Sequence, residues 1–220
     1  VCECSDIDNV IVFRSDGKMM VTKVAAKTFV GKGVIHMAVF KKNDVRTIYN
    51  LIYRDGKQGN TYMKRFPVKS ITRDKEYDLT SGNKGSKILH FTANPNGEAE
   101  VVSVILKSQA KTRKLKFDVD FADLAIKGRG SKGNLVSKHP LSKVELKSKG
   151  VSTLAAQKIW FDDTVQRLNI DGRGELLGEF AGDDKILVIS QSGEYQLLGF
   201  DLSTHFPEDM IVLEKLDTKK

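Results

Sequence analysis

The sequence VIVFRSDGKMMV, residues 10–21, contains the clearest structural pattern in the chain. Two runs of β-branched and large apolar residues flank a short polar turn that contains Asp16 and Gly17. An Asp-Gly pair supplies the positive φ that tight turns between antiparallel strands require. The stretch therefore predicts a β-hairpin.

The same order of run, glycine turn and run recurs along the chain. The further copies are LIYRDG (51–56) with TYMKRF (61–66), ILHF (88–91) with NPNG (94–97) and EVV (100–102), VQRLNIDG (165–172) and ILVISQSG (186–193). Their glycines, with Gly133 as a degenerate fourth copy, give a period of about 40 residues up to Gly172, which Gly193 breaks. A strand-based repeat of that length is typical of blades around an axis. We expect an all-β, propeller-like fold of about five blades, with four to six allowed, as a single domain over residues 1–220; an irregular β-sandwich is the alternative.

One segment leaves its secondary structure open. Residues 152–158 (STLAAQK) can form two turns of helix with Ser or Thr as the cap, or a strand that leads into residues 159–161. Residues 127–150, rich in Gly, Lys and Ser, are interpreted as a long blade loop rather than a linker, because strand-like sequence flanks them.

The composition is that of a globular protein, with 40% hydrophobic residues among 220. No apolar run approaches the ~18 residues that cross a membrane, so we expect a soluble protein with no membrane partner. Cys2 and Cys4 are too close along one strand to form a disulfide, which favours the cytoplasm. The four histidines lack metal-ligand spacing, so no metal site is predicted. The chain begins with Val, and we expect it to be a fragment of a longer protein.

The charge is unevenly distributed. Residues 1–106 carry 17 Lys and Arg against 11 Asp and Glu, residues 107–149 carry 12 against 4, and residues 150–216 carry 5 against 12. A concentrated basic segment attracts polyanions by counterion release, which favours a nucleic-acid partner over a merely solvated lysine-rich loop.

Catalytic motifs are absent from the sequence. Residues 128–133 (GRGSKG) are rich in glycine, but the following NLVSKHP predicts a strand that ends at Pro140, not the helix that a nucleotide-binding loop needs. The pairs Asp162-Asp163 and Asp183-Asp184 fall at turn-like positions. We therefore expect no enzyme activity from this chain alone and no cofactor.

Three stretches resemble the C-terminal DNA-binding domain of bacterial type IIA topoisomerase A subunits, in the style of a Bacteroidetes topoisomerase IV. They are residues 2–24, the strand YMKRF (62–66) and LAIKG (124–128). The family repeat ends in a basic pair, which Lys64-Arg65 matches fully. The resemblance implies a β-pinwheel with swapped strands, around whose outer edge duplex DNA runs. It also implies an ATP-dependent strand-passage core whose catalytic tyrosine lies outside this chain, with the rest of the A subunit and the ATPase subunit as partners, near the cytoplasmic nucleoid.

The resemblance favours topoisomerase IV over DNA gyrase. Gyrase carries a box of the form Gln-Arg-Arg-Gly-Gly-Lys-Gly, and the nearest stretch here, KGRGSKG at 127–133, lacks the Gln and the Arg pair. It also follows three earlier copies instead of accompanying the first blade. A gyrase A domain stays as the alternative within the family.

On this interpretation, basic side chains on the rim hold the phosphates, and bases are not contacted. The expected DNA-binding residues are Lys64, Arg65, Lys84, Lys87, Lys111, Arg113, Lys114, Lys127, Arg129, Lys132 and Lys138. Lys18 and Lys23 are weaker candidates, and the acidic residues from Asp162 to Glu214 mark a face that DNA avoids or a brake on binding. A β-propeller scaffold that docks acidic proteins is the second function class. An RNA-binding β protein is the third, but it needs exposed aromatic side chains, and Phe117 and Phe121 lie in strand-like sequence.

Overall fold

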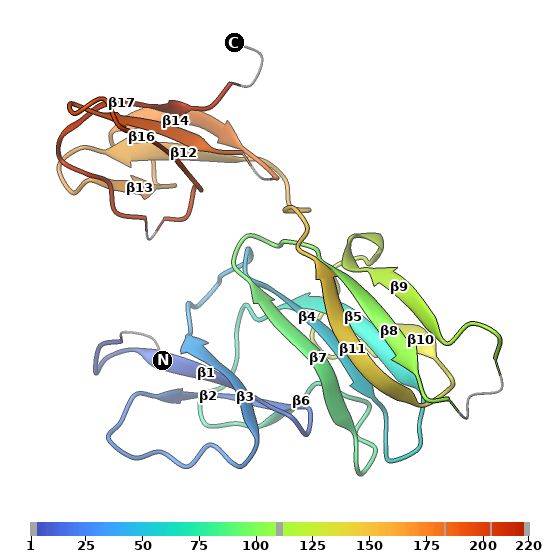
Figure 1. Ribbon diagram of the computed structural model, residues 1–220. Helices are drawn as coiled ribbons and strands as arrows, with labels where there is room; N and C mark the ends of the chain where they lie inside the picture. Colours follow the sequence, from blue (N-terminus) through green and yellow to red (C-terminus); the bar gives the residue numbers. More distant parts are fainter. Residues whose placement is uncertain (1–3, 109–111, 183, 203, 218–220) are drawn as a thin grey trace. The chain divides into compact units, whose positions relative to one another are not determined.

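The computed structural model describes residues 4–108, 112–182, 184–202 and 204–217. These residues form five antiparallel sheets, one short 3-10 helix and no α-helix (Figure 1). The prediction of an all-β, pinwheel-like fold with about five blades is confirmed. No helix in the described ranges is long and apolar enough to span a membrane.

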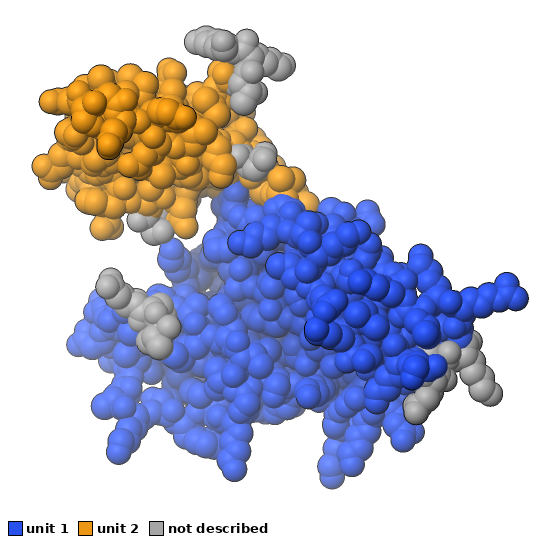
Figure 2. All heavy atoms as spheres, in the orientation of Figure 1, with its two compact units in different colours: residues 1–150 blue, residues 151–220 orange. Residues whose placement is uncertain are grey.

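The chain divides into two compact units, Val1–Gly150 (unit 1) and Val151–Lys220 (unit 2), coloured separately in Figure 2. Unit 1 contains three of the sheets and unit 2 contains the other two. The expectation of a single domain over the whole chain stays a prediction.

The first sheet of unit 1 has the strand order β3-β1-β2-β6. Gly17, with φ of 85°, closes the β1–β2 hairpin, so the first predicted hairpin is confirmed. Its strands are β1 (Asn9–Arg14), β2 (Lys18–Lys23), β3 (Val34–Val39) and β6 (Tyr77–Asp78).

The second sheet has the order β10-β5-β4-β7, and the third has the order β11-β8-β9. Gly56 lies in the turn of the β4–β5 hairpin, as predicted. The second sheet contains β4 (Ile48–Arg54), β5 (Thr61–Pro67), β7 (Lys87–Asn94) and β10 (Asn134–Ser137). The third contains β8 (Val101–Leu106), β9 (Lys116–Asp120) and β11 (Leu141–Ser148), with the 3-10 helix η1 (Phe121–Asp123) after β9.

The first two sheets are completed by a strand that returns from further along the chain. β6 follows the β4–β5 hairpin of the second sheet but pairs with β2 of the first. β10 likewise follows the β8–β9 hairpin of the third sheet but pairs with β5 of the second (Figure 1). Each returning strand crosses from one sheet to its predecessor, which ties consecutive sheets of unit 1 together.

Unit 2 has one sheet of order β13-β12-β14 and one of order β16-β15-β17. A single bridge between Arg167 and His205 stands where a returning strand would pair with β13. The strands are β12 (Gln157–Asp162), β13 (Arg167–Asn169), β14 (Glu175–Phe180), β15 (Ile186–Ser190), β16 (Tyr195–Leu198) and β17 (Met210–Lys215). Residues 152–156 contain no helix, so this segment is a lead-in to β12.

Three of the predicted hairpins are wrong. Gly97 lies between β7 and β8, which belong to different sheets, and Gly133 precedes β10, a returning strand. Gly172 lies between β13 and β14, which both pair with β12 and not with each other. Each of these glycines has a positive φ, but the turn joins strands that are not paired. The hairpin at Gly193, which broke the expected period, is real and joins β15 to β16.

Each unit buries its own apolar core. In unit 1 the first and second sheets share one cluster around Phe13, Tyr53 and Phe66, and the second and third share another around Val102 and Phe121. The opposite face of the third sheet is polar, with Ser103 and Lys147 bonded to Asp118 and Lys143 paired with Glu145. In unit 2 the two sheets enclose a cluster that includes Ile159, Phe180 and Phe206. The buried clusters found among the described residues of unit 1 extend as far as the third sheet.

Candidate nucleic-acid interface

The two units carry opposite charge. Unit 1 has 29 Lys and Arg against 15 Asp and Glu, a formal charge of +14, and unit 2 has 7 against 13, a formal charge of −6. A polyanion is therefore attracted to unit 1 and repelled by unit 2.

Residues 127–133, which we call the basic loop, lie directly on β5. The Lys127 amide donates to the Arg65 carbonyl at 3.0 Å, and Ile126 forms a parallel bridge with Arg65. At the other end of the loop Gly133 has φ of +88°, and a Cβ there would lie 2.3 Å from the Met63 carbonyl oxygen. Only glycine fits this close approach of two backbones.

Lys64 and Arg65 lie in the interior, not on the rim where the sequence placed them. Their side chains point to opposite faces of β5, yet they are only 2% and 1% exposed. The basic loop covers one face, where Lys64 Nζ donates to the carbonyls of Arg129 and Ser131 at 2.6 and 2.9 Å. On the other face Arg65 donates to Asn50 Oδ1 and to backbone carbonyls that include those of Gly97 and Phe121. Neither charged end reaches solvent, so neither can touch a phosphate in this structure.

The other cations of the basic loop lie at the surface beside tyrosine rings. The Arg129 guanidinium lies 4.5 Å from the Tyr77 ring centroid and donates to the Ser70 carbonyl at 2.9 Å. Lys132 Nζ lies 4.6 Å from the Tyr62 centroid, and the Lys127 side chain is exposed. Rings fix such cations by cation–π attraction while leaving their outer side open.

The turn at residues 81–87 adjoins the basic loop. Asp55 connects them, since its carboxylate accepts from Ser86 at 3.5 Å and lies 3.9 Å from Lys132 Nζ. Tyr53 also spans both, donating to the Lys132 carbonyl at 2.7 Å and lying 3.5 Å from Ser81 Oγ. The expected residue Lys84 lies on this turn, Lys87 lies where the turn enters β7, and both are exposed.

Sequence reasoning missed two cations at this surface. Lys75 Nζ lies 5.5 Å from the centroid of the same Tyr77 ring that Arg129 covers. Lys57 touches the 81–87 turn, because a Cβ on Gly85 would lie 2.6 Å from its Cγ. Only these contacts in the folded chain identify the two lysines as part of the surface. We call the resulting set the basic surface: Lys57, Lys75, Lys84, Lys87, Lys127, Arg129 and Lys132.

The remaining expected residues form a separate group or lie elsewhere. Arg113 and Lys114 are exposed in the connection between β8 and β9, and Lys138 is exposed after β10. The Lys107 amide donates to the Pro140 carbonyl at 3.0 Å, which brings these two segments together. Lys111 lies outside the described residues. Of the weaker candidates, Lys18 is paired with Asp78 at 2.8 Å, and Lys23 is exposed.

A family model described as "Topoisomerase C-terminal domain, Bacteroidota" matches residues 3–149 and 167–220. The chain belongs to this family. The matched ranges are interrupted at residues 150–166, where the boundary between the two units lies. Family membership supports a non-catalytic, DNA-binding domain of a type II topoisomerase.

Two solved structures resemble this topoisomerase domain. The C-terminal domain of DNA topoisomerase IV is 8% identical with a TM-score of 0.41, covering 96% of this chain and 80% of that one. A DNA gyrase A C-terminal domain is 15% identical with a TM-score of 0.30, covering 98% and 80%. No curated protein matches the chain.

Three groups at or beneath the basic surface of this topoisomerase domain have shifted pKa values. Burial lowers the pKa of Lys64 from 10.5 to about 8, and attraction to Asp78 offsets only part of this effect. The pKa of Tyr62 is lowered by hydrogen bonds with Asn60 and then Lys132. The pKa of Tyr77 is lowered by its hydrogen bond with Thr72 and then by Lys75 and Arg129. Both sets of contacts thus favour the ionised form of the tyrosine hydroxyl.

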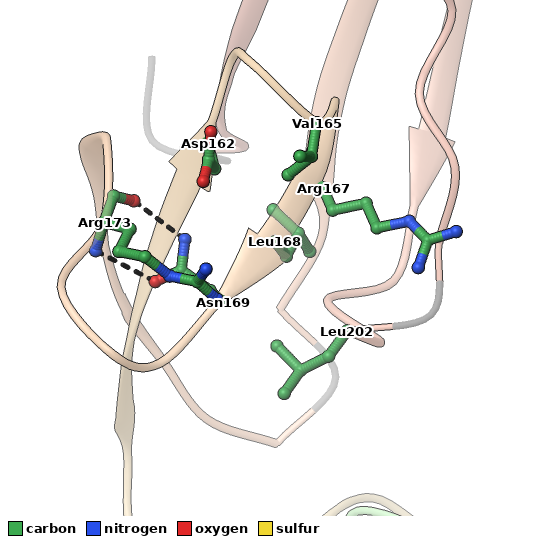
Figure 3. Close-up of a pocket in the computed structure, with 7 residues that line it drawn as sticks. All are labelled: Asp162, Val165, Arg167, Leu168, Asn169, Arg173 and Leu202. Atoms are coloured by element: carbon green, nitrogen blue, oxygen red, sulfur yellow. Dashed lines mark hydrogen bonds between the residues drawn. The ribbon is translucent and has the colours of Figure 1, made fainter.

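Unit 2 of the topoisomerase domain contains a shallow hollow of about 630 Å³ (Figure 3). Asn169 at its wall is already bonded to the backbone of Arg173, as donor to the carbonyl and as acceptor from the amide. The lining residues are Asp162, Val165, Arg167, Leu168, Asn169, Arg173 and Leu202. Within the ranges that the structure describes, no cluster of three or more His, Cys, Asp or Glu can hold a metal ion. The exposed cations of unit 1 are therefore the surface best suited to a ligand.

Proposed function

We propose that unit 1 bends or wraps duplex DNA along the basic surface and presents it to the strand-passage core of a type IIA topoisomerase of the topoisomerase IV kind. One observation supports this most strongly: seven cations from four separate segments lie next to one another on unit 1, and six of them are exposed. Arg113, Lys114 and Lys138 extend the contact.

Phosphate contacts of this kind are independent of base sequence. Bending 20–30 base pairs by 40–90° costs on the order of 1–6 kcal/mol, which several Lys and Arg contacts together can offset. The acidic unit 2 is the part of the domain that DNA avoids. Lys64 and Arg65 act from the interior and not as phosphate contacts.

The other parts of the proposed topoisomerase complex are not in this chain. We infer that the catalytic tyrosine belongs to another part of the A subunit, that a separate subunit supplies ATP hydrolysis, and that the complex works at the cytoplasmic nucleoid. The basic loop supports the topoisomerase IV kind over gyrase, because it has neither the Gln nor the Arg pair of the gyrase box.

Fluorescence anisotropy tests the proposal, with duplexes of about 15, 30 and 45 base pairs across a salt series. Affinity should rise with length, and log K should fall with log salt at about 0.9 per phosphate held. Equal binding of all three lengths, or equal competition by acidic peptides, would favour a protein-docking scaffold instead.

A further inference from the structure

Lys64 is a cation enclosed in the interior beneath the basic loop. Its ammonium donates to two loop carbonyls, those of Arg129 and Ser131, and lies 5.1 Å from the Phe66 ring centroid. Removing a cation from water is costly unless its hydrogen bonds are satisfied inside. The two hydrogen bonds that Lys64 donates to the basic loop offset this cost.

The loop has further interior anchors at both ends. The Lys127 amide bonds to the Arg65 carbonyl, and the Lys132 carbonyl accepts from Tyr53 Oη. Carbonyls at positions 129, 131 and 132 are therefore bonded to interior donors, while the side chains of Lys127 and Lys132 are exposed. Lys64 supplies the two central anchors of this loop.

We propose that Lys64 is a positioning residue for DNA, whose ammonium holds the backbone of the basic loop so that Lys127, Arg129 and Lys132 face the phosphates together. This inference rests on the proposed DNA-binding function. It gives the basic pair Lys64-Arg65 an internal role: Lys64 shapes the contact surface, and Arg65 bonds β5 to the segments that flank β8 and β9.

The surroundings of Lys64 make its hold on the loop sensitive to pH. The groups that face it or its ligands are Asp78 on β6, which pairs with Lys18 of β2, Tyr53 on β4, and Asp55, Tyr62 and Tyr77 around the loop. Because the pKa of Lys64 is about 8, its charge is lost between pH 7 and 9 while exposed lysines stay charged. A charge-assisted hydrogen bond is about twice as strong as a neutral one, so the loop is held less firmly at pH 9.

The same titration changes stability in the opposite direction. The folded state binds this proton less tightly than the unfolded chain does, so the contribution of Lys64 to the free energy of unfolding rises between pH 8 and 10.5. We therefore expect DNA affinity to fall over the pH range in which this residue makes the fold more stable. A side chain that only stabilised the fold would move both quantities together.

The first test compares Lys64→Met with Lys41→Met in the whole chain, by anisotropy with a 45-base-pair duplex across a salt series. Lys41 is exposed and lies outside the basic surface, so its loss should remove at most one contact, or ~0.9 from the salt slope. Lys64→Met should reduce the slope by more than one contact and affinity on the order of 10- to 100-fold, because three cations lose their arrangement. Equal effects of the two substitutions would overturn the proposal.

The second test follows the pH dependence of the wild-type chain, with Lys64→Met only as its comparison. Affinity at fixed salt should fall several-fold from pH 7.5 to 9, while Lys64→Met, which keeps Tyr62 and Tyr77, should show a flatter profile. Hydrogen exchange of the 127–133 peptide without DNA should accelerate over the same pH range beyond the intrinsic base-catalysed rate. An unchanged loop would overturn the positioning role even if DNA binds, whereas failure of the wild type to bind DNA would refute only the proposed function.

Discussion

Unit 1 and unit 2 are built from similar small sheets, yet they use charge differently. Unit 1 carries a formal charge of +14 and buries Lys64, Arg65, Glu100 and Asp55 among its sheets. Unit 2 carries −6, and the buried polar side chains among its described residues are Ser152 and Asn169. The comparison teaches that some of the basic residues in a DNA-binding β domain shape the surface from within, while others form it.

The buried network of unit 1 should be the more sensitive part. Arg65→Met leaves Asn50 Oδ1 and several carbonyls without their donor, and we expect it to destabilise unit 1 by about 3–5 kcal/mol. The single tryptophan, Trp160, lies in unit 2. Its fluorescence should therefore report the same unfolding transition as in the wild type, while hydrogen exchange in β4 and β5 accelerates. An equal loss of stability in the transition that Trp160 reports would mean that the two units unfold as one.

The difference in surface charge should decide DNA binding. Replacing Lys127, Arg129 and Lys132 together by Glu should remove about three phosphate contacts, lowering the salt slope by ~2.7 and affinity on the order of 100-fold or more. The matched control reverses three exposed cations of unit 2, Lys158, Arg167 and Arg173. It should change the slope by less than one contact, as measured by anisotropy. A larger effect of the control would place DNA on unit 2.

A buried carboxylate sharpens the comparison at low pH. Burial alone would raise the pKa of Glu100, but hydrogen bonds from His90 and Thr92 lower it below its usual 4.5. Its stabilising effect is therefore complete above pH 4.5 and is lost as the pH falls through the lowered value. Glu100→Gln should destabilise unit 1 by about 2 kcal/mol at pH 7 and by much less near pH 3, measured by urea unfolding. A constant difference across this range would show that the charge of Glu100 is unimportant.

The smallest effect is expected in unit 2. Asn169 shapes the 170–174 turn by accepting from the Asp171 and Arg173 amides, and its side chain is 6% exposed. Asn169→Ala should destabilise unit 2 by about 1 kcal/mol. Trp160, which pairs with Asn169 across the sheet, should report this directly, with exchange in unit 1 unchanged.

Local patterns predicted the fold class because strands and positive-φ glycines leave a direct mark in sequence. They identified the hairpins at Gly17, Gly56 and Gly193. They failed at Gly97, Gly133 and Gly172, since the same turn chemistry also joins strands of different sheets or strands separated by a third. Strand return cannot be read locally, because β6 and β10 pair with partners far away in the chain.

The candidate site was predicted in part. Lys127 and Lys132 were named from the basic segment 107–149, and Lys84 and Lys87 from their place on the repeats. Lys57 and Lys75 were missed because only the fold brings them beside these residues. Lys64 and Arg65 were misplaced because strand alternation predicts one exposed member of the pair, whereas the basic loop covers that face. Only tertiary structure distinguishes a cation beneath a loop from one on a rim.

The returning strands have a consequence for the growing chain during synthesis. The first sheet lacks its last strand until Tyr77–Asp78 has left the ribosome, and the second lacks its last until Asn134–Ser137 has followed. Until then β2 and then β5 present unpaired backbone edges, the kind of surface on which nascent β proteins aggregate. A nascent or truncated chain that stops near residue 130 would thus lack β10, and its second sheet would be incomplete although the other strands of that sheet lie earlier in the chain. The order of synthesis and the order of completion are offset by one blade.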